Sequence, residues 1–322
     1  MISGFPGLAL NAFSILVVSA TATLLLLSAA IQCRVMHSRW LTAEARQSGL
    51  WLLVLAPWTV GLTAAVIVMS LSAPAVAVSF GNDLIHWHHP TLFTIDSWHG
   101  YFVLAMFGLA VAMAVRAAQR VAAATNLERM LLAMSSQQAD GTLLLDADTP
   151  AAFTAGLGNP RFFLTRPLLE ALSPEEYEVI RLHELAHVRR RDPLRKTVFQ
   201  LLSGFFPGSV ARALNSHMNT AIEQSADMSV ANAIPDHALI ARVLLKVRRL
   251  TLSAEHRRGT TFSLCHFGLD NVDQRIGYLL SDSRGRGLPL AVAALTLFML
   301  SIGCAVAADS VHHFIEHALQ HL

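Results

Sequence analysis

Four apolar runs, each close to the length of a membrane-crossing helix, constrain the fold of this 322-residue chain more than any other feature. They cover residues 8–31, 50–71, 98–115 and 288–308. About 20 helical residues cross a bilayer core of about 30 Å, so all four runs approach that length and the third is the shortest. Charged residues make up only 14% of the chain, which leaves few to interrupt such helices. The sequence therefore predicts an α-helical membrane protein with four transmembrane helices.

Lysine and arginine are confined to two stretches of the chain. They are absent before Arg34, from residues 72–100 and after Arg286. Loops rich in these residues stay on the cytoplasmic side of a membrane. We therefore predict a multi-pass protein of the inner (cytoplasmic) membrane, with both termini and the loop at 72–100 outside and residues 116–286 in the cytoplasm.

These assignments divide the chain into three parts. Residues 1–118 form a three-helix transmembrane region, residues 119–287 a cytoplasmic domain, and residues 288–322 the fourth helix with a short outer tail. The middle part is long enough to fold around its own core. Its apolar stretch at 197–214 could be mistaken for a fifth span. We interpret it as a buried or interfacial helix pair broken at Gly204 and Pro207, because a span there would separate the candidate metal ligands across the membrane.

Three short strands are predicted in the cytoplasmic domain, at 142–146, 151–155 and 161–165. The remainder of the domain is expected to be helical, which gives an α+β fold. An edge strand can pair with an extended peptide and hold it over a catalytic centre. We name Phe153, Thr154 and Ala155 as candidate substrate-binding residues. The alternative is that the strands only cap the core.

A His-Glu-x-x-His pattern occupies residues 183–187. Ser173, with a proline next and Glu176 three positions on, is a start signal for the helix that carries it. His183 and His187 are one turn apart, so both imidazoles project from one face and can bind the same Zn²⁺. Glu184 is placed to act as the general base that activates water.

A catalytic zinc site needs a third protein ligand and an open fourth position. Glu223 and Asp227 are also one helical turn apart. We predict that Glu223 is the third ligand and that Asp227 hydrogen-bonds a ligand histidine from behind. The alternative is that both residues lie on a solvated helix face. The oxyanion-stabilising residue is left open among His237, Arg242 and Arg275.

Other reactive or charged residues point to simpler roles. Cys33, Cys265 and Cys304 are not expected to form disulfides, because no close pair is evident and the cytoplasm is reducing. The basic cluster at 189–191, with Arg195 and Lys196, is better explained by lipid head groups or acidic side chains than by nucleic acid. We therefore expect membrane lipids as partners and no direct binding of nucleic acid.

Histidines gather in the two predicted outer segments. His86, His88, His89 and His99 belong to the loop, and the tail carries the set His312, His313, His317 and His321. The simpler interpretation is an amphipathic helix at the membrane interface. The sharper hypothesis is an outer metal or pH sensor, because histidine titrates near neutrality and binds Zn²⁺ or Cu²⁺.

Residues 150–227 resemble the BlaR/MecR family of membrane antirepressor zinc metallopeptidases. The similarity lies in Phe153, Gly156 and Gly158, in Pro160-Arg161 with the strand that follows, in the string from His183 to Leu194, in Phe206-Pro207, and in Glu223 with Asp227. Three helices before the domain and one after it also fit. The resemblance implies a gluzincin-type zinc endopeptidase with His183, His187 and Glu223 as ligands and Glu184 as base. It also implies that the substrate is a cytoplasmic protein, typically a BlaI-like transcriptional repressor, and that self-cleavage is common.

Two departures from that family keep alternatives open. Drug-sensing members carry an extracellular penicillin-binding domain after the last helix, where this sequence has residues 309–322, so direct β-lactam sensing is not expected. The segment from Glu223 to Asp227 lacks the cysteine that is common before the aspartate, and it partly resembles HtpX-type quality-control proteases. The alternatives are an HtpX-like quality-control protease and a non-proteolytic membrane metal or pH sensor.

Overall fold

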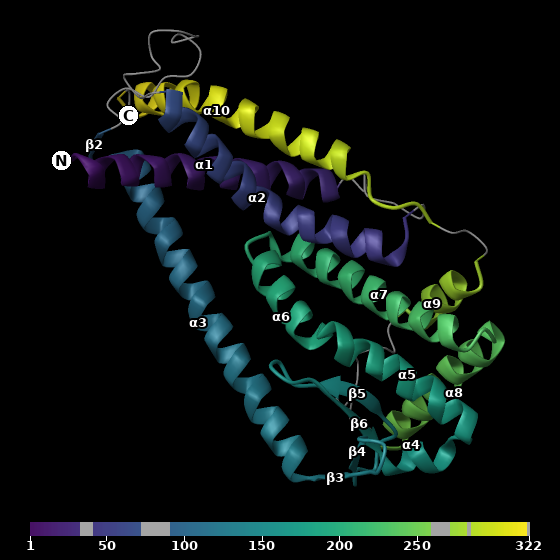
Figure 1. The fold of residues 1–322 in the computed structure, drawn as a ribbon. Helices are drawn as coiled ribbons and strands as arrows, with labels where there is room; N and C mark the ends of the chain where they lie inside the picture. Colours follow the sequence, from purple (N-terminus) through teal and green to yellow (C-terminus); the bar gives the residue numbers. More distant parts are fainter. Residues whose placement is uncertain (33–40, 72–90, 259–270, 282–284, 321–322) are drawn as a thin grey trace.

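The computed structural model describes residues 1–32, 41–71, 91–258, 271–281 and 285–320. Within these residues each of the four predicted apolar runs forms a helix long and apolar enough to cross a membrane, with residues 290–307 as the crossing part of the last one. Figure 1 shows three of these helices side by side and the other leaving them at an angle. The four helices are α1 (Phe5–Gln32), α2 (Ala43–Leu71), α3 (Trp98–Ala133) and α10 (Leu290–Gln320).

Small residues let α1, α2 and α10 approach closely. A side chain added at Gly61 of α2 would lie 2.4 Å from the carbonyl oxygen of Leu16 in α1. Close backbone approach at small residues is the usual way that membrane helices pack, because apolar surface alone gives no preference for helix over lipid. The buried cluster between the three helices is Ile15, Ala64, Ala65, Val68 and Ala305.

Both ends of the chain lie at the same end of this bundle. β1 (Ile2–Ser3) pairs with β2 (Leu92–Phe93) in a two-stranded antiparallel sheet. Figure 1 places this sheet beside the C-terminal end of α10, with the remaining domain at the opposite end of the helices. β1, β2 and the end of α10, which the charge pattern assigns to the outside, are therefore on one side, and residues 135–258 and 271–279 are on the other. Which compartment each side faces remains a prediction.

Helix α3 is longer than the predicted third span. The expected span ends at residue 115, whereas α3 continues to Ala133. Its second half is rich in Ala, Arg and Leu and contains neither glycine nor proline, so nothing in residues 116–133 stops the helix. Its 36 residues correspond to about 54 Å of helix at 1.5 Å per residue. The predicted domain boundary at 118/119 thus falls inside a continuous helix that links the bundle of apolar helices to the domain that follows.

A four-stranded sheet forms in the predicted α+β domain, with the order β3-β4-β6-β5. The three predicted strands are present, and a fourth, β3, was not predicted because Ser135–Gln137 is short and polar. β6 pairs in parallel with β4 and antiparallel with β5, which leaves β5 at the edge. The strands are β3 (Ser135–Gln137), β4 (Leu143–Leu145), β5 (Ala152–Ala155) and β6 (Arg161–Thr165).

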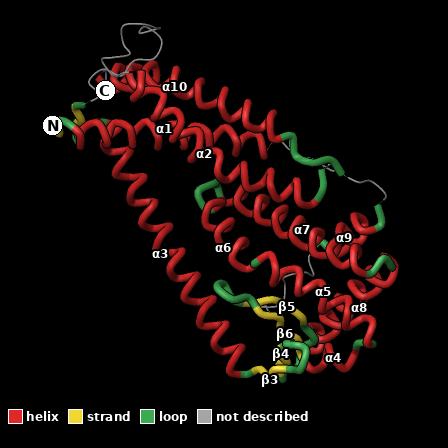
Figure 2. Tube along the Cα trace, in the orientation of Figure 1, coloured by secondary structure: helices red, strands yellow, loops and turns green. Residues whose placement is uncertain are grey.

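Figure 2 shows this small sheet in yellow with red helices of the domain beside it. Phe162 and Leu164 of β6 point into the main core, where Val179 and Ile180 also lie. Phe163, on the opposite face of the same strand, packs near the end of α3. The remaining helices are α4 (Arg166–Ala171), α5 (Pro174–Arg190), α6 (Asp192–Ser203), α7 (Gly208–Ala233), α8 (His237–Arg258) and α9 (Val272–Leu279).

The apolar stretch at 197–214 is a helical hairpin and not a fifth span. α6 ends at Ser203 and α7 begins at Gly208, so the predicted break at Gly204 and Pro207 is confirmed. Trp51 and Trp58 of α2 make edge contacts with aromatic rings of the hairpin, at centroid distances of 5.4 and 4.9 Å. The hairpin therefore packs against the membrane-spanning part of α2. The buried cluster at this contact is Leu50, Val54, Phe199, Phe206, Val210, Leu214, Met218 and Ile222.

Several predicted features lie outside the described residues, namely His86, His88, His89, His321, Cys33 and Cys265. The tail at 309–320 continues α10 as a helix. Cys304 has a free thiol near the hydroxyl of Thr23. The role of the outer histidines stays a prediction.

The contact between α2 and the α6–α7 hairpin leads to a prediction about the stability of the protein. Phe199 is fully buried between α2 and α7, whereas its neighbour Val198 is 38% exposed. Phe199→Ala leaves a cavity and is expected to cost about 3 kcal/mol or more, as buried Phe→Ala changes do. Val198→Ala is the matched control and is expected to cost well under 1 kcal/mol. The measurement is the thermal midpoint of the full chain in detergent, and equal midpoints for the two variants would contradict the described packing.

Candidate metal centre

Helix α5 presents the two histidines of the His-Glu-x-x-His pattern. Its start is defined by the predicted capping box, in which Ser173 and Glu176 each accept a hydrogen bond from the other's backbone N–H. Its end is at Arg191, whose φ of 53° is left-handed and turns the chain back across α5. Between these two points the helix is regular, so His183 and His187 project from one face toward α7.

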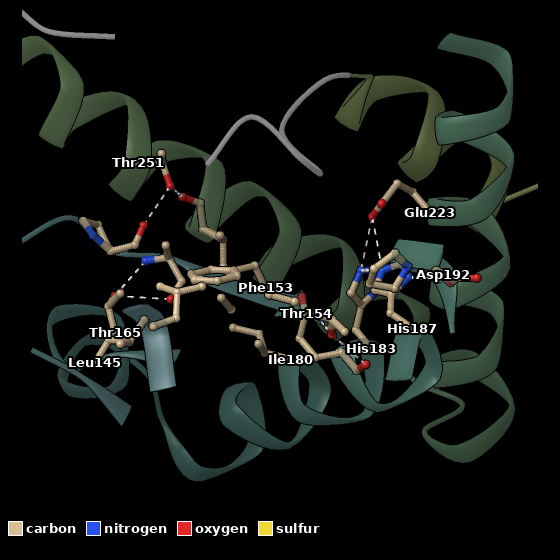
Figure 3. A pocket seen from close by; sticks show the side chains of 18 of the residues that line it. Leu145, Phe153, Thr154, Thr165, Ile180, His183, His187, Asp192, Glu223 and Thr251 are labelled. Atoms are coloured by element: carbon tan, nitrogen blue, oxygen red, sulfur yellow. Dashed lines mark hydrogen bonds and ion pairs between the residues drawn. The ribbon is translucent and has the colours of Figure 1, made fainter. Parts of the chain in front are cut away.

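Three donor atoms converge at this face. Nε2 of His183 lies 3.2 Å from Nε2 of His187, and the two nitrogens lie 3.3 and 3.6 Å from Oε2 of Glu223. In a tetrahedral zinc site with bonds of 2.0–2.1 Å, neighbouring ligand atoms are separated by about 3.4 Å. The triangle of donors therefore fits Zn²⁺ closely. Figure 3 shows the two imidazoles and Glu223 pointing toward one another from α5 and α7, so the structure brings the predicted ligand set together.

A carboxylate lies behind each histidine. Oδ1 of Asp227 is 3.0 Å from Nδ1 of His183, and Oδ2 of Asp192 is 2.7 Å from Nδ1 of His187. A carboxylate there holds the proton on Nδ1, which leaves the Nε2 lone pair for a metal. Asp227 occupies the predicted position. Asp192 was not predicted as part of the site. It lies there because the turn at Arg191 places the start of α6 beside His187.

The charges around the donors set their affinities for protons. Burial lowers the pKa of His183, but hydrogen bonds to Asp227 and Glu223 outweigh it and raise that pKa to about 9. Burial alone raises the pKa of Glu223, yet the nearby Lys196 and His187 bring it well below its ordinary range. The pKa of Asp227 is lowered in the same way, chiefly by Arg275 against the effect of burial. The site therefore favours ionised carboxylates, and protons and metal compete for His183.

Glu184 lies beside the donor triangle and is in contact with the edge strand. The Thr154 hydroxyl is 2.8 Å from Oε2 of Glu184 and 3.2 Å from its backbone carbonyl oxygen. Of the three predicted substrate-binding residues, Thr154 faces α5, whereas Phe153 stacks on Phe163 on the other side of the sheet. Ala155 shares the side of Phe153, because side chains alternate along a strand. Substrate binding by this strand remains a prediction.

Two cations complete the electrostatics. Lys196 Nζ is 3.2 Å from Oε1 of Glu223, which is the carboxylate oxygen outside the donor triangle. Arg275 forms two hydrogen bonds of 2.7 and 2.8 Å to Asp227 and also lies 3.5 Å from Glu223. Arg275, an oxyanion candidate, is thus engaged with the acidic residues of the site. The other two candidates, His237 and Arg242, are exposed on α8.

The basic cluster after α5 has acidic partners. Arg190 and Arg195 both donate hydrogen bonds to Asp192, at 2.9 and 3.3 Å, and Lys196 pairs with Glu223. These contacts agree with the prediction that acidic side chains explain part of the cluster. No spacing rule indicated Lys196 or Asp192, since both reach the site through the packing of α6 on α7.

A cavity of about 650 Å³ extends from the donors along the edge strand. Its end at the donors holds His183, Glu184 and Glu223, and apolar side chains line part of it further on, beginning with Ile180 one turn before His183. Figure 3 shows this arrangement, with Ile180 and Phe153 between the metal-binding residues and the distant Thr251. The end of α3 contributes part of the wall, through Ala124, Leu127, Leu131 and Met134.

The family model described as Peptidase family M48 matches residues 116–254. The matched region includes the whole four-stranded sheet, α5 and α7, and so contains every residue of the donor triangle and Glu184. Peptidases of this family are typically zinc-dependent, which agrees with the donor geometry. The chain therefore carries a region similar to Peptidase family M48, joined to four helices able to cross a membrane, and this combination suggests a membrane-associated metallopeptidase. The match does not distinguish the antirepressor subtype that the sequence resembles.

Competition between protons and metal predicts the pH dependence of zinc binding. A bound histidine must be neutral, and the metal-free His183 has a pKa of about 9, so at pH 7.5 zinc uptake is expected to displace a proton from it. Affinity should then rise with pH up to about 9, by about tenfold per pH unit for each displaced proton. Titration calorimetry in two buffers of different ionisation enthalpy measures the protons released. Equal release at pH 7.5 and pH 10 would contradict the raised pKa of His183.

Proposed function

We propose that the chain is a membrane-embedded zinc endopeptidase of the gluzincin type, acting on a protein on the cytoplasmic side of the inner membrane. The observation that carries the proposal is the triangle of His183, His187 and Glu223 beside Glu184, at the edge of a sheet. Among the described residues two imidazoles and one carboxylate converge, which is the ligand set of a catalytic site with an open position. The positive charges of residues 116–286 support the cytoplasmic placement.

The chemistry divides between the metal and the side chains of the chain. Bound zinc supplies Lewis-acid polarisation and lowers the pKa of water. Glu184 takes the proton from the attacking water and passes it to the leaving amine. Because the Thr154 hydroxyl donates to Oε2, we assign the proton transfer to Oε1 of Glu184. Asp227 and Asp192 keep the histidine protons on Nδ1 throughout.

The edge strand suggests how the substrate is held. β5 pairs with β6 on one side, and its other edge borders the cavity that contains the donors. An extended peptide added at that edge gains backbone hydrogen bonds that do not depend on its sequence. The apolar part of the cavity then receives a side chain of the peptide. This arrangement suits cleavage within an extended segment of a protein.

The assignment of the base makes a sharp prediction. Glu184→Gln removes only the proton acceptor, so the variant is expected to keep zinc but to lose at least about a hundredfold in cleavage rate. His183→Ala is expected to lose both zinc and cleavage. Glu175→Gln, exposed in the first turn of the same helix, is the matched control and should retain both. Zinc is measured by elemental analysis and cleavage on a bound protein substrate; wild-type cleavage by Glu184→Gln would refute the role of the base.

Our first candidate for the substrate is a BlaI-like transcriptional repressor. The support is the three-plus-one helix layout and the sequence strings shared with the antirepressor family, from His183 to Leu194 and at Phe206-Pro207. In this proposal the membrane helices receive a signal and the peptidase domain removes the repressor. A second candidate is HtpX-like quality control of membrane proteins, and the match to Peptidase family M48 does not support the repressor over it.

Deletion of the gene separates these two candidates. If the substrate is a repressor, deletion stabilises one DNA-binding protein and changes a small regulon. If the function is quality control, damaged membrane proteins accumulate generally and no repressor does. Quantitative proteomics of the deletion strain, complemented with the wild type or with Glu184→Gln, measures both outcomes. A wild-type protein that cleaves nothing in either background would instead support a non-proteolytic metal or pH sensor.

A further inference from the structure

A buried polar side chain on the membrane helix α2 makes contacts at both of its ends. Gln47 is 4% exposed and lies in the first turns of α2. Its Nε2 donates to the carbonyl oxygen of Ala221 in α7 at 3.1 Å. Its Oε1 accepts from Nη2 of Arg195 in α6 at 3.0 Å. A buried amide costs free energy unless its donor and acceptor are both satisfied, so these contacts hold α2 in one register against the peptidase domain.

The contact with Arg195 continues to a metal ligand. Arg195 donates from Nη1 to Oδ1 of Asp192 at 3.3 Å. Oδ2 of Asp192 lies 2.7 Å from Nδ1 of His187, and this carboxylate is 1% exposed. Two side chains therefore connect Gln47 to His187, and each link is a hydrogen bond or an ion pair. Asp192 is also held by Arg190, so loss of the Arg195 contact weakens its placement without abolishing it.

The same turn of α2 reaches the other side of the site. Arg46 donates to the side chain of Gln224, which directly follows Glu223 in α7. Gln224 in turn donates to the carbonyl oxygen of Gln274 at 3.1 Å, and the next residue, Arg275, holds Asp227. Adjacent residues of one membrane helix thus contact the elements that carry both carboxylates behind the histidines.

We propose that Gln47 is a positioning residue for the metal ligand His187 and acts through Arg195 and Asp192. The position of α2 in the membrane then sets the orientation of a zinc ligand. This inference rests on the zinc peptidase proposed above. Its rival is a purely structural role, in which Gln47 only fastens α2 to α6 and α7. A structural role changes the melting temperature, whereas a positioning role also changes how the metal is held.

The test measures the metal itself in the full chain reconstituted in nanodiscs. The variants are Gln47→Met, Arg195→Met and the double variant, with Ser48→Ala on the exposed face of the same turn as the matched control. The zinc Kd is measured by chelator competition, and the ligand geometry by the visible absorption of the Co²⁺-substituted protein. Changes behind a ligand histidine weaken metal binding by 10–100-fold, and we expect about tenfold for Gln47→Met because Arg190 still holds Asp192.

The double variant decides whether the two residues act in one chain of contacts. If Gln47 acts through Arg195, the double variant raises the zinc Kd no more than does the single variant with the larger effect. Fold-changes that multiply would overturn the proposal, as would a Kd and a Co²⁺ spectrum equal to those of Ser48→Ala. Arg195 is partly exposed, so Arg195→Met tests the link even if Gln47→Met does not fold. An unchanged zinc Kd in Arg195→Met would also overturn the proposal. A wild type that binds no zinc refutes the proposed function instead, so the two failures are distinguishable.

Discussion

The pairing of each ligand histidine with a buried carboxylate is the contact on which the rest of the centre depends. Asp227 and Asp192 fix the tautomer and the orientation of His183 and His187, and without them the donor triangle has no reason to close. Burying these acidic groups is costly, so each needs a cation, which explains why Arg275 and the arginines after α5 turn inward. The packing of α6 and α7 against α5, and of α9 against α7, brings these cations to the acidic groups.

The membrane helices supply the frame for that packing. The hairpin of α6 and α7 inserts its apolar tip against α2, while its polar ends carry Asp192 and Glu223. The metal centre is thus built on elements whose other ends lie among membrane-spanning helices. A soluble peptidase domain tethered by a flexible linker would not have this arrangement. Here the ligand-bearing helices and the membrane helix share one buried cluster.

The sequence predicted those parts of the fold that local patterns determine. The lengths of the apolar runs predicted the four long helices, and the capping residues Ser173 and Glu176 predicted the start of α5. The one-turn spacing of Glu223 and Asp227 indicated which residues join the histidines. The sequence did not indicate Asp192 or Lys196, because their places in the site depend on the left-handed turn at Arg191 and on the packing of α6 across α5. Nor did it indicate β3, whose polar residues form a strand only because β4 offers a partner.

The length of α3 has a mechanical consequence. This helix touches the bundle near its N-terminal end and contributes part of the cavity wall at its C-terminal end. A rigid rod of 36 residues, about 54 Å long, that tilts by about 5° about its N-terminal end carries its C-terminal end through about 5 Å. That displacement equals the spacing of neighbouring strands in a sheet, about 4.8 Å. A small change in the tilt of α3 is therefore enough to move this part of the cavity wall by the width of one strand.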